Sequence, residues 1–557
     1  TVASPRQCYT AQHPAMFRRP ASHASVALLL AAACAALPPR AQSQTVFEER
    51  LQAIMSRPLF RHSRFGIEFY SLDEGRVLYA RSPQELFIPG STTKILTVGT
   101  ALELLGPDFR FHTRIYRAGE VGADGVLHGD LVMVAAGDPN LSGRIQPDGS
   151  LAFQDEDHSY GFARARPVPG DPLLVIRELA RQVAAKGIRR VDGTVRVDAT
   201  LFTEGPRELG TGVVISPIVV NDNLIDVTVA PGQREGDPAT LIIAPQSRYV
   251  AIANQVKTVA RGATELEWAN DSAAAGGSRS ATLTGTIALG ASPKLQVYHV
   301  PVPSRFAEVV LTEALQDAGV QVTSPYVAGA AQFGQLQRFY TPDREMAEHV
   351  SPPLREAAKV ILKVSQNLHA SMLPYIVGAY LKKGSTDAPQ AGFDLERAML
   401  DRAGLDLTAA VQNDGAGGAA LFAPDFVIHF LVHLSKQQFF PDFLKSLPVL
   451  GQDGTLAEIQ VHSPAAGHVF AKTGTHGGPN ALSGGGVING KGLAGFVDTQ
   501  DGHRLAFAAY INFVPISSFS EEELNKVGQA MGEIAAAAYD GFIAAGGAQD
   551  PKPARPK

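Results

Sequence analysis

The pattern of hydrophobic and polar positions predicts helices mixed with strands toward both ends of the chain and mostly strands in its middle. Near the start, two apolar-rich runs at 65–70 and 76–80 flank the turn Asp73-Glu74-Gly75, a pattern typical of a β-hairpin. A first amphipathic helix is predicted before this hairpin, at 44–60, and helical spacing runs after it from Ser91 to Gly106. Late in the chain, helices are predicted at 354–370, 367–382, 424–435 and 520–543. Apolar runs at 466–475, 492–497 and 504–511 are typical of strands.

The middle of the chain has a different texture. From about 107 to 345, short β-type runs alternate with Gly, Pro, Asn and Asp, and only 173–186 and 305–318 read as helices. The pattern predicts an α+β protein with a discontinuous domain, 44–106 plus 346–545. The mostly β region 107–345, of two subdomains, is inserted into it, and 546–557 form a disordered Pro/Lys-rich tail.

The first 43 residues read as a processing segment. Arg18-Arg19 precede an apolar run at 25–37, and small residues follow up to Ser43, as in a secretory signal. Met16 is a candidate start, and the run is shorter than the roughly 20 residues that span a bilayer. An uncleaved anchor and lipidation at Cys34 remain as alternatives. We expect an exported, periplasmic protein with peripheral or no membrane contact.

Composition excludes several classes of function. The net charge is −5, with no basic run outside the termini, which argues against a nucleic-acid partner. Both cysteines, Cys8 and Cys34, lie in the processing segment, so the mature protein has no disulfide or thiolate site. The 15 histidines form no paired motif, and 138–140 and 221–223 are typical of Asx turns. We therefore expect no metal and no cofactor.

One glycine-rich stretch, 485–491, imitates a phosphate-binding loop because it ends in Lys491. The next residue is Gly492, where such loops need Ser or Thr to bind magnesium, and a strand follows where a helix is required. We reject nucleotide binding on these grounds.

Three short motifs carry candidate chemistry. Ser91-Thr92-Thr93-Lys94 opens a buried helix, Ser365-Gln366-Asn367 lies between helical runs, and Lys472-Thr473-Gly474 lies on a strand. A serine at a helix N-terminus with an amine one turn away can become a nucleophile. Each motif alone is also explained by a helix cap, a chance tripeptide or a strand end. Their joint occurrence in this order is the pattern of penicillin-binding proteins and serine β-lactamases.

Further segments resemble the D-Ala-D-Ala carboxypeptidase/endopeptidase family of class C penicillin-binding proteins over roughly residues 45–545. They are the runs 87–94, 105–107, 129–131 with 137–139, 447–456 and 471–475, together with the long interval from Ser91 to Ser365. The resemblance implies a transpeptidase-like domain, an antiparallel sheet with helices on both faces, carrying a large insertion. The chain departs from the family at Gly90, where alanine is usual, in the serine-free loop 414–419, and in the extra residues 476–491.

The resemblance also implies a role for each motif residue. Ser91 would be the nucleophile and Lys94 its base, with a pKa depressed by Lys472 and partial burial. Ser365 would pass a proton to the leaving amine, and Asn367 would bind the substrate amide and hold Lys94. The backbone N–H groups of Ser91 and Thr475 would form the oxyanion hole. Thr473, Gly474 and Thr475 would bind the substrate, and Lys472 with the Thr473 and Thr475 hydroxyls would attract its terminal carboxylate.

The implied partners are peptidoglycan peptides, and β-lactam antibiotics as covalent inhibitors. Two other readings stay open from the sequence. A β-lactamase would turn over nitrocefin rapidly, although no glutamate motif for a deacylating water is evident. A catalytically inactive cell-wall binding protein would explain the altered loop at 414–419, although all three motifs are intact.

Overall fold

The computed structural model describes residues 39–162, 164–323 and 332–540. The predicted apolar signal run with Cys34, and the tail 546–557, lie outside these residues. The chain forms two compact units, of which 51–540 is one; residues 39–50, the described part of the other, belong to helix α2 (Pro39–Met55). In the described ranges, no helix is both long enough and apolar enough to cross a bilayer.

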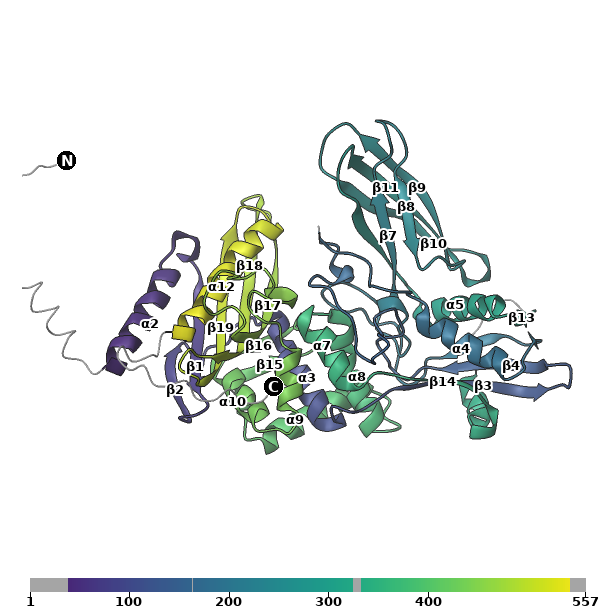
Figure 1. Ribbon diagram of the computed structural model, residues 1–557, viewed down its shortest axis with the longest axis horizontal. Coiled ribbons are helices and arrows are strands. Elements are labelled where there is room, and N and C mark those ends of the chain that lie inside the picture. The colour runs from purple at the N-terminus through teal and green to yellow at the C-terminus, as the bar shows by residue number, and fades with distance from the viewer. Residues whose placement is uncertain (1–38, 163, 324–331, 541–557) are drawn as a thin grey trace, which may run out of the picture. The chain divides into compact units, whose positions relative to one another are not determined.

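The candidate site is built on a five-stranded antiparallel sheet in the order β17-β18-β19-β1-β2 (Figure 1). The predicted hairpin forms β1 (Arg64–Ser71) and β2 (Arg76–Arg81). The late apolar runs form β17 (Val469–Asn480), β18 (Gly485–Asp498) and β19 (Arg504–Ile516). Segments from the early and the late part of the chain therefore share one sheet, since β1 pairs along its whole length with β19.

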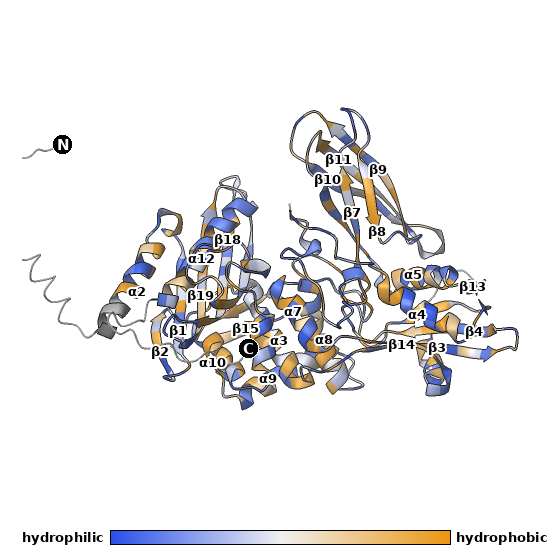
Figure 2. Ribbon diagram, viewed as in Figure 1, coloured by the Kyte–Doolittle hydropathy of each residue, from blue (hydrophilic) through white to orange (hydrophobic). Residues whose placement is uncertain are grey.

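Helices cover both faces of this sheet. Helix α12 (Glu521–Asp540) packs on β18 and β19, while α10 (Pro424–Ser435) packs on β19 and β1. Figure 2 shows α10 largely in the colour of hydrophobic residues, as its sequence PDFVIHFLVHLS requires for a buried helix. The same core takes in α3 (Thr93–Leu105), α7 (Leu354–Lys363), α8 (Asn367–Leu381), α9 (Ala388–Arg402) and α11 (Phe440–Ser446), with the small hairpin β15 (Ala410–Gln412) and β16 (Ala420–Phe422) beside them.

The middle of the chain is mostly β, as the pattern predicts, and most of it packs around a second hydrophobic core. One sheet holds β3 (His112–Val121), β4 (Val126–Val134), β5 (Arg190–Val191), β6 (Val195–Asp198), β13 (Gln321–Val322) and β14 (Glu345–Val350). The others hold β7 (Leu224–Ala230), β8 (Thr240–Ala244) and β12 (Lys294–His299), and β9 (Val250–Val259), β10 (Glu265–Ala273) and β11 (Arg279–Ala288). The helices are α4 (Leu174–Ala185), α5 (Pro303–Asp317) and the short α6 (Phe333–Leu336).

The extra residues 476–491 lengthen one hairpin. Strand β17 continues past the Lys472-Thr473-Gly474 motif to Asn480, and β18 returns from Gly485, with a register shift between His476 and Gly477. The stretch that imitates a phosphate loop is thus the first half of β18. Its last residue, Lys491, lies directly opposite Thr475.

Candidate active site

The serine of the first motif lies in a tight turn that precedes α3. Residues Gly90–Thr92 form a single 3-10 turn, and Gly90 has a φ of +52°, which favours glycine. A Cβ on Gly90 would come within 2.7 Å of the backbone nitrogen of Thr475. Glycine at this position, where alanine is usual in the family, therefore admits close contact between this turn and β17.

Strand β17 meets the same turn through a second glycine. A Cβ on Gly474 would lie 2.0 Å from the carbonyl oxygen of Pro89 and 3.0 Å from the nitrogen of Ser91. No side chain fits there, so the backbone of the third motif lies against the backbone of the first. This contact sets Ser91 and Thr475 side by side.

The ammonium group of Lys94 joins the first two motifs. Its Nζ lies 2.7 Å from Ser91 Oγ, 2.6 Å from Asn367 Oδ1 and 3.3 Å from Ser365 Oγ, and 3.2 Å from the carbonyl oxygen of Ala416. A protonated amine has three N–H donors for these four oxygens, whereas a neutral amine has two donors and one lone pair. The neutral form can therefore accept the Ser91 O–H proton while donating to Asn367.

Burial lowers the pKa of Lys94 to about 7, and the carboxylates of Glu208, Asp414 and Asp157 oppose that change. The cause differs from the sequence-based expectation in two respects. Lys94 is completely buried rather than partly so, and burial rather than the charge of Lys472 lowers its pKa. An amine that is half neutral near pH 7 is suited to act as a base.

Ser365 lies between the two buried lysines. Lys472 Nζ is 2.9 Å from Ser365 Oγ and 2.8 Å from the carbonyl oxygen of Thr473. Burial, then the charges of Lys94 and Lys491, hold the pKa of Lys472 well below its usual range. The break between α7 and α8 makes this placement possible, since Ser365 itself takes a left-handed φ of +64°. The structure thus brings Ser91, Lys94, Ser365, Asn367 and Lys472 together.

A tyrosine that the motif analysis did not single out completes this cluster. The Tyr160 hydroxyl donates to the carbonyl oxygen of Ser365, at 2.6 Å, and lies 2.9 Å from Asn367 Oδ1. Burial raises the pKa of Tyr160, so the hydroxyl remains a neutral donor. It comes from the β-rich middle of the chain, and no spacing rule connects it with Ser365.

The serine-free loop 414–419 contributes backbone atoms instead of hydroxyls. Its Ala416 carbonyl accepts from Lys94, and its Gly415 carbonyl accepts from Thr97 Oγ1 at 2.9 Å. The Asp414 carboxylate folds the loop by accepting from the N–H of Ala416, at 2.7 Å, and of Ala419, also at 2.7 Å. The loop therefore shapes the site even though it lacks the two serines usual in the family.

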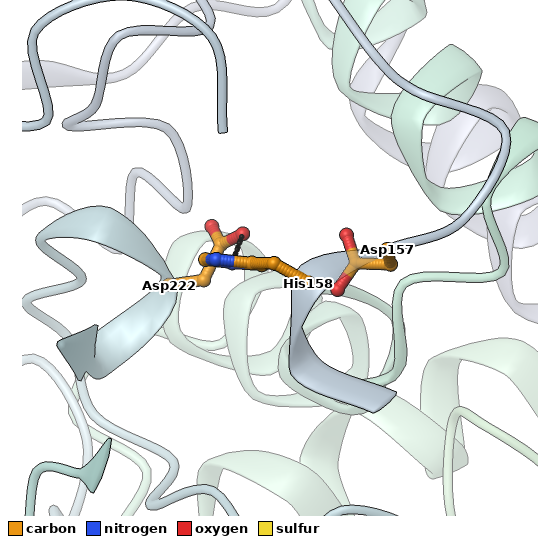
Figure 3. A group of neighbouring side chains, drawn as sticks. All are labelled: Asp157, His158 and Asp222. Carbon is orange, nitrogen blue, oxygen red and sulfur yellow. Dashed lines mark hydrogen bonds and ion pairs between the residues drawn. The ribbon is translucent and has the colours of Figure 1, made fainter. Parts of the chain in front are cut away.

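Below the second motif lies a buried ion network that includes Asp157, His158 and Asp222 (Figure 3). His158 contacts Asp222 through Nε2 and Asp226 through Nδ1, each at 2.8 Å, and Arg144 contacts Asp157 at 3.0 Å and Asp222 at 2.6 Å. These three side chains have the geometry of a metal site. Yet the Arg144 guanidinium already supplies the cation, and both ring nitrogens of His158 face carboxylates, so the residues do not fit a metal ion.

The charges of the network stabilise one another. Burial lowers the pKa of His158, but the carboxylates of Asp226 and Asp222 outweigh burial and hold this pKa well above its usual value. Burial likewise opposes ionisation of Asp222, but Arg144 and His369 hold its pKa well below the usual range. Gln366 donates to Asp157 at 3.2 Å, so the network anchors the residue between Ser365 and Asn367.

Strand β18 carries one more group, opposite the end of the third motif, that the sequence did not flag as functional. Thr473 Oγ1 lies 2.7 Å from Thr455 Oγ1, while Thr475 Oγ1 accepts a hydrogen bond from Lys491 Nζ, also at 2.7 Å. In the sequence, Lys491 ends the stretch that imitates a phosphate-binding loop. Its real setting follows from strand pairing across an extended hairpin, which no local pattern indicates.

Comparison with known proteins gives a consistent result. Residues 47–538 match the model of the D-Ala-D-Ala carboxypeptidase 3 (S13) family. A D-alanyl-D-alanine carboxypeptidase from an Actinomadura species is 28% identical over 481 residues, which cover 82% of this chain and 81% of that protein. The D-alanyl-D-alanine carboxypeptidase DacB of Haemophilus influenzae is 22% identical over 473 residues, 82% of this chain and 87% of that protein.

The fold also has relatives among solved structures. The crystal structure of penicillin binding protein 4 (dacB) from Haemophilus influenzae has a TM-score of 0.65 at 19% identity, covering 87% of this chain and 97% of that chain. A second structure of that protein, complexed with a novel β-lactam, has a TM-score of 0.62 at 18% identity, covering 87% and 98%. The likeness shows a shared fold.

Proposed function

The chain belongs to the D-Ala-D-Ala carboxypeptidase 3 (S13) family, and from this membership we propose that it hydrolyses D-alanyl-D-alanine and cross-link amides of peptidoglycan peptides. The observation that carries the proposal is the set of contacts made by one buried amine. Lys94 Nζ lies within hydrogen-bond distance of Ser91, Ser365 and Asn367. The reaction class is acyl transfer to a serine followed by hydrolysis.

In the first step, Ser91 Oγ attacks the carbonyl carbon of the penultimate D-alanine, and the hydroxyl proton passes to the neutral amine of Lys94. The C–O bond forms as the carbonyl becomes a tetrahedral oxyanion, which the N–H groups of Ser91 and Thr475 stabilise. One such donor typically contributes a factor of ~10²–10³ to the rate. The contact between Gly90 and the backbone of Thr475 supports this assignment.

In the second step, the C–N bond breaks and the leaving amine takes a proton from Ser365 Oγ. Ser365 is then reprotonated by Lys94 or Lys472, whose Nζ atoms lie 3.3 and 2.9 Å from its hydroxyl oxygen. Asn367 orients both Lys94 and the substrate amide. Water hydrolyses the Ser91 ester and restores the free enzyme. A β-lactam also forms an ester with the Ser91 oxygen, but its leaving nitrogen stays covalently attached and remains in the site.

We also propose the domain division and the location. The second hydrophobic core, built mainly from residues between Ile115 and Val320, supports an inserted region 107–345 within a catalytic domain of 44–106 plus 346–545, while some residues of the inserted region, such as Phe111 and Phe202, pack into the first core. Because peptidoglycan lies outside the inner membrane, the enzyme is exported to the periplasm, with residues 1–43 as its signal segment. Peptidoglycan peptides are its substrates and β-lactams its covalent inhibitors.

The test is covalent labelling with a fluorescent penicillin, followed by denaturing electrophoresis. Wild type becomes labelled, Ser91→Ala does not, and Ser385→Ala, which alters an exposed serine in a loop after α8, keeps its label. An unlabelled wild type would refute the acyl-enzyme site. Digestion of purified peptidoglycan then separates carboxypeptidase activity, which releases free D-alanine, from endopeptidase activity, which converts cross-linked dimers to monomers.

A further inference from the structure

The motif lysine of β17 is already engaged inside the protein. Lys472 has no exposed surface, and its ammonium contacts Ser365 Oγ and the Thr473 carbonyl oxygen. The pKa of Lys472 is also held well below its usual range, by burial first and then by two neighbouring lysines. Its position suits proton transfer at Ser365. A substrate carboxylate that binds beside β17 therefore needs another source of positive charge.

Lys491 lies where such a charge would act. It is the direct cross-strand neighbour of Thr475, so both side chains lie on the same face of the β17–β18 hairpin. Its Nζ donates to Thr475 Oγ1 at 2.7 Å, and Thr475 is exposed. An ammonium has three N–H donors, and this contact uses one of them.

Among the residues that the structure describes, the charge of Lys491 has no protein counterion. Across the described parts of the chain, no Asp or Glu carboxylate forms an ion pair with its ammonium. Burial lowers the pKa of Lys491 to about 8, so most molecules carry the positive charge at neutral pH. A half-buried cation without a counterion, beside an exposed hydroxyl, favours binding of an anion from solution.

Resting on the proposed function, we propose that Lys491, acting together with the Thr475 hydroxyl, binds the free carboxylate of the leaving D-amino acid and the equivalent carboxylate of β-lactams. This assignment separates two tasks on one hairpin. Lys472 handles protons at Ser365, and Lys491 recognises the anion. The extra residues 476–491 then have a specific purpose, because they place a lysine of β18 beside the end of the substrate site.

The experiment compares two probes that differ in the carboxylate. One is a fluorescent penicillin, whose carboxylate is free, measured as the second-order rate constant of acylation. The other is a neutral alkyl boronic acid without a carboxylate, which forms a reversible adduct with the Ser91 hydroxyl, measured as a Kd by calorimetry. The variants are Lys491→Met, which removes the charge, and Lys491→Arg, which keeps it. Lys383→Met, at an exposed lysine after α8, is the matched control.

We expect Lys491→Met to slow acylation by penicillin about 10- to 100-fold, the usual range for a hydrogen bond to a charged group. Its Kd for the boronic acid stays within about threefold of wild type. Lys491→Arg recovers most of the acylation rate, and Lys383→Met matches wild type. The inference is wrong if Lys491→Met acylates as fast as wild type, if it loses both probes equally, or if Lys491→Arg is as slow as Lys491→Met. A wild type that reacts with neither probe refutes the proposed function itself.

Discussion

The pH dependence of acylation tests the role of Lys94 directly. A lysine with the ordinary pKa of 10.5 would be neutral in only about one molecule in 3,000 at pH 7, whereas a pKa of about 7 makes about half of the molecules neutral. The difference corresponds to about 5 kcal/mol of interaction that disfavours the charged form. Since the base must be neutral, the acylation rate constant rises with pH, reaching about a tenth of its plateau at pH 6 and nine tenths at pH 8.

Replacing Glu208 by Gln moves this profile in a defined direction. After burial, the charge of Glu208 is the largest influence on Lys94, and it raises the pKa. Its removal lowers the pKa of Lys94 further, so the rise in acylation rate shifts to lower pH. Stopped-flow measurement with a penicillin from pH 5 to 9 gives both profiles, with Glu265→Gln, at an exposed position, as the matched control.

Two results would refute this reasoning. A wild-type rate that is flat from pH 5.5 to 8.5 means that no group with a pKa near 7 controls acylation. A Glu208→Gln profile displaced to higher pH means that the electrostatic balance around Lys94 has the opposite sign. Thermal unfolding of each variant over the same pH range separates either result from loss of the fold.

The remaining predictions concern four further sites. Ser365→Ala slows acylation by about 10²–10⁴-fold, the usual contribution of a proton-transfer group, while circular dichroism shows an unchanged fold. Tyr160→Phe loses the hydroxyl that donates to the second motif and lowers kcat/KM about tenfold, as expected for about 1.4 kcal/mol. Gly474→Ala abolishes penicillin labelling because its Cβ would lie 2.0 Å from a carbonyl oxygen, whereas Gly478→Ala, which meets open space, labels normally. Asp222→Asn lowers the free energy of unfolding by about 3–5 kcal/mol in urea titrations at pH 7, because it breaks a buried ion pair. The wild-type advantage over this variant shrinks at acid pH, since a carboxyl with a depressed pKa stabilises the fold only while it is ionised.

Local patterns predicted much of the fold. The hairpin of β1 and β2, the helix after Ser91, and the β-rich middle of the chain all follow from periodicity and turn residues. The sequence did not indicate that β1 pairs with β19, because that pairing joins segments more than 400 positions apart. The sequence placed Ser365-Gln366-Asn367 between helical runs, but it did not indicate the left-handed backbone of Ser365, since a left-handed serine is imposed by tertiary contacts rather than by propensity.

The candidate site was predictable only where its residues belong to motifs. Ser91 and Lys94 are one helical turn apart, so their proximity follows from geometry. Tyr160 and Lys491 have no such relation to any motif, and their positions depend on how the inserted region and a long hairpin fold. The cause of the Lys94 pKa was also hidden, because the sequence cannot show whether a lysine is partly or completely buried.

The ion network beneath Gln366 has a consequence for any attempt to shorten the protein. Arg144, Asp157, His158 and Asp222 all come from residues 107–345, while Gln366 and His369 come from outside this region. Deletion of that region would leave the buried side chains of Gln366 and His369 without these hydrogen-bond partners, and it would remove the Tyr160 hydroxyl. We expect a shortened protein made in this way to retain every signature motif but to lose activity, because the middle of the chain supplies buried contacts to the Ser365-Gln366-Asn367 motif.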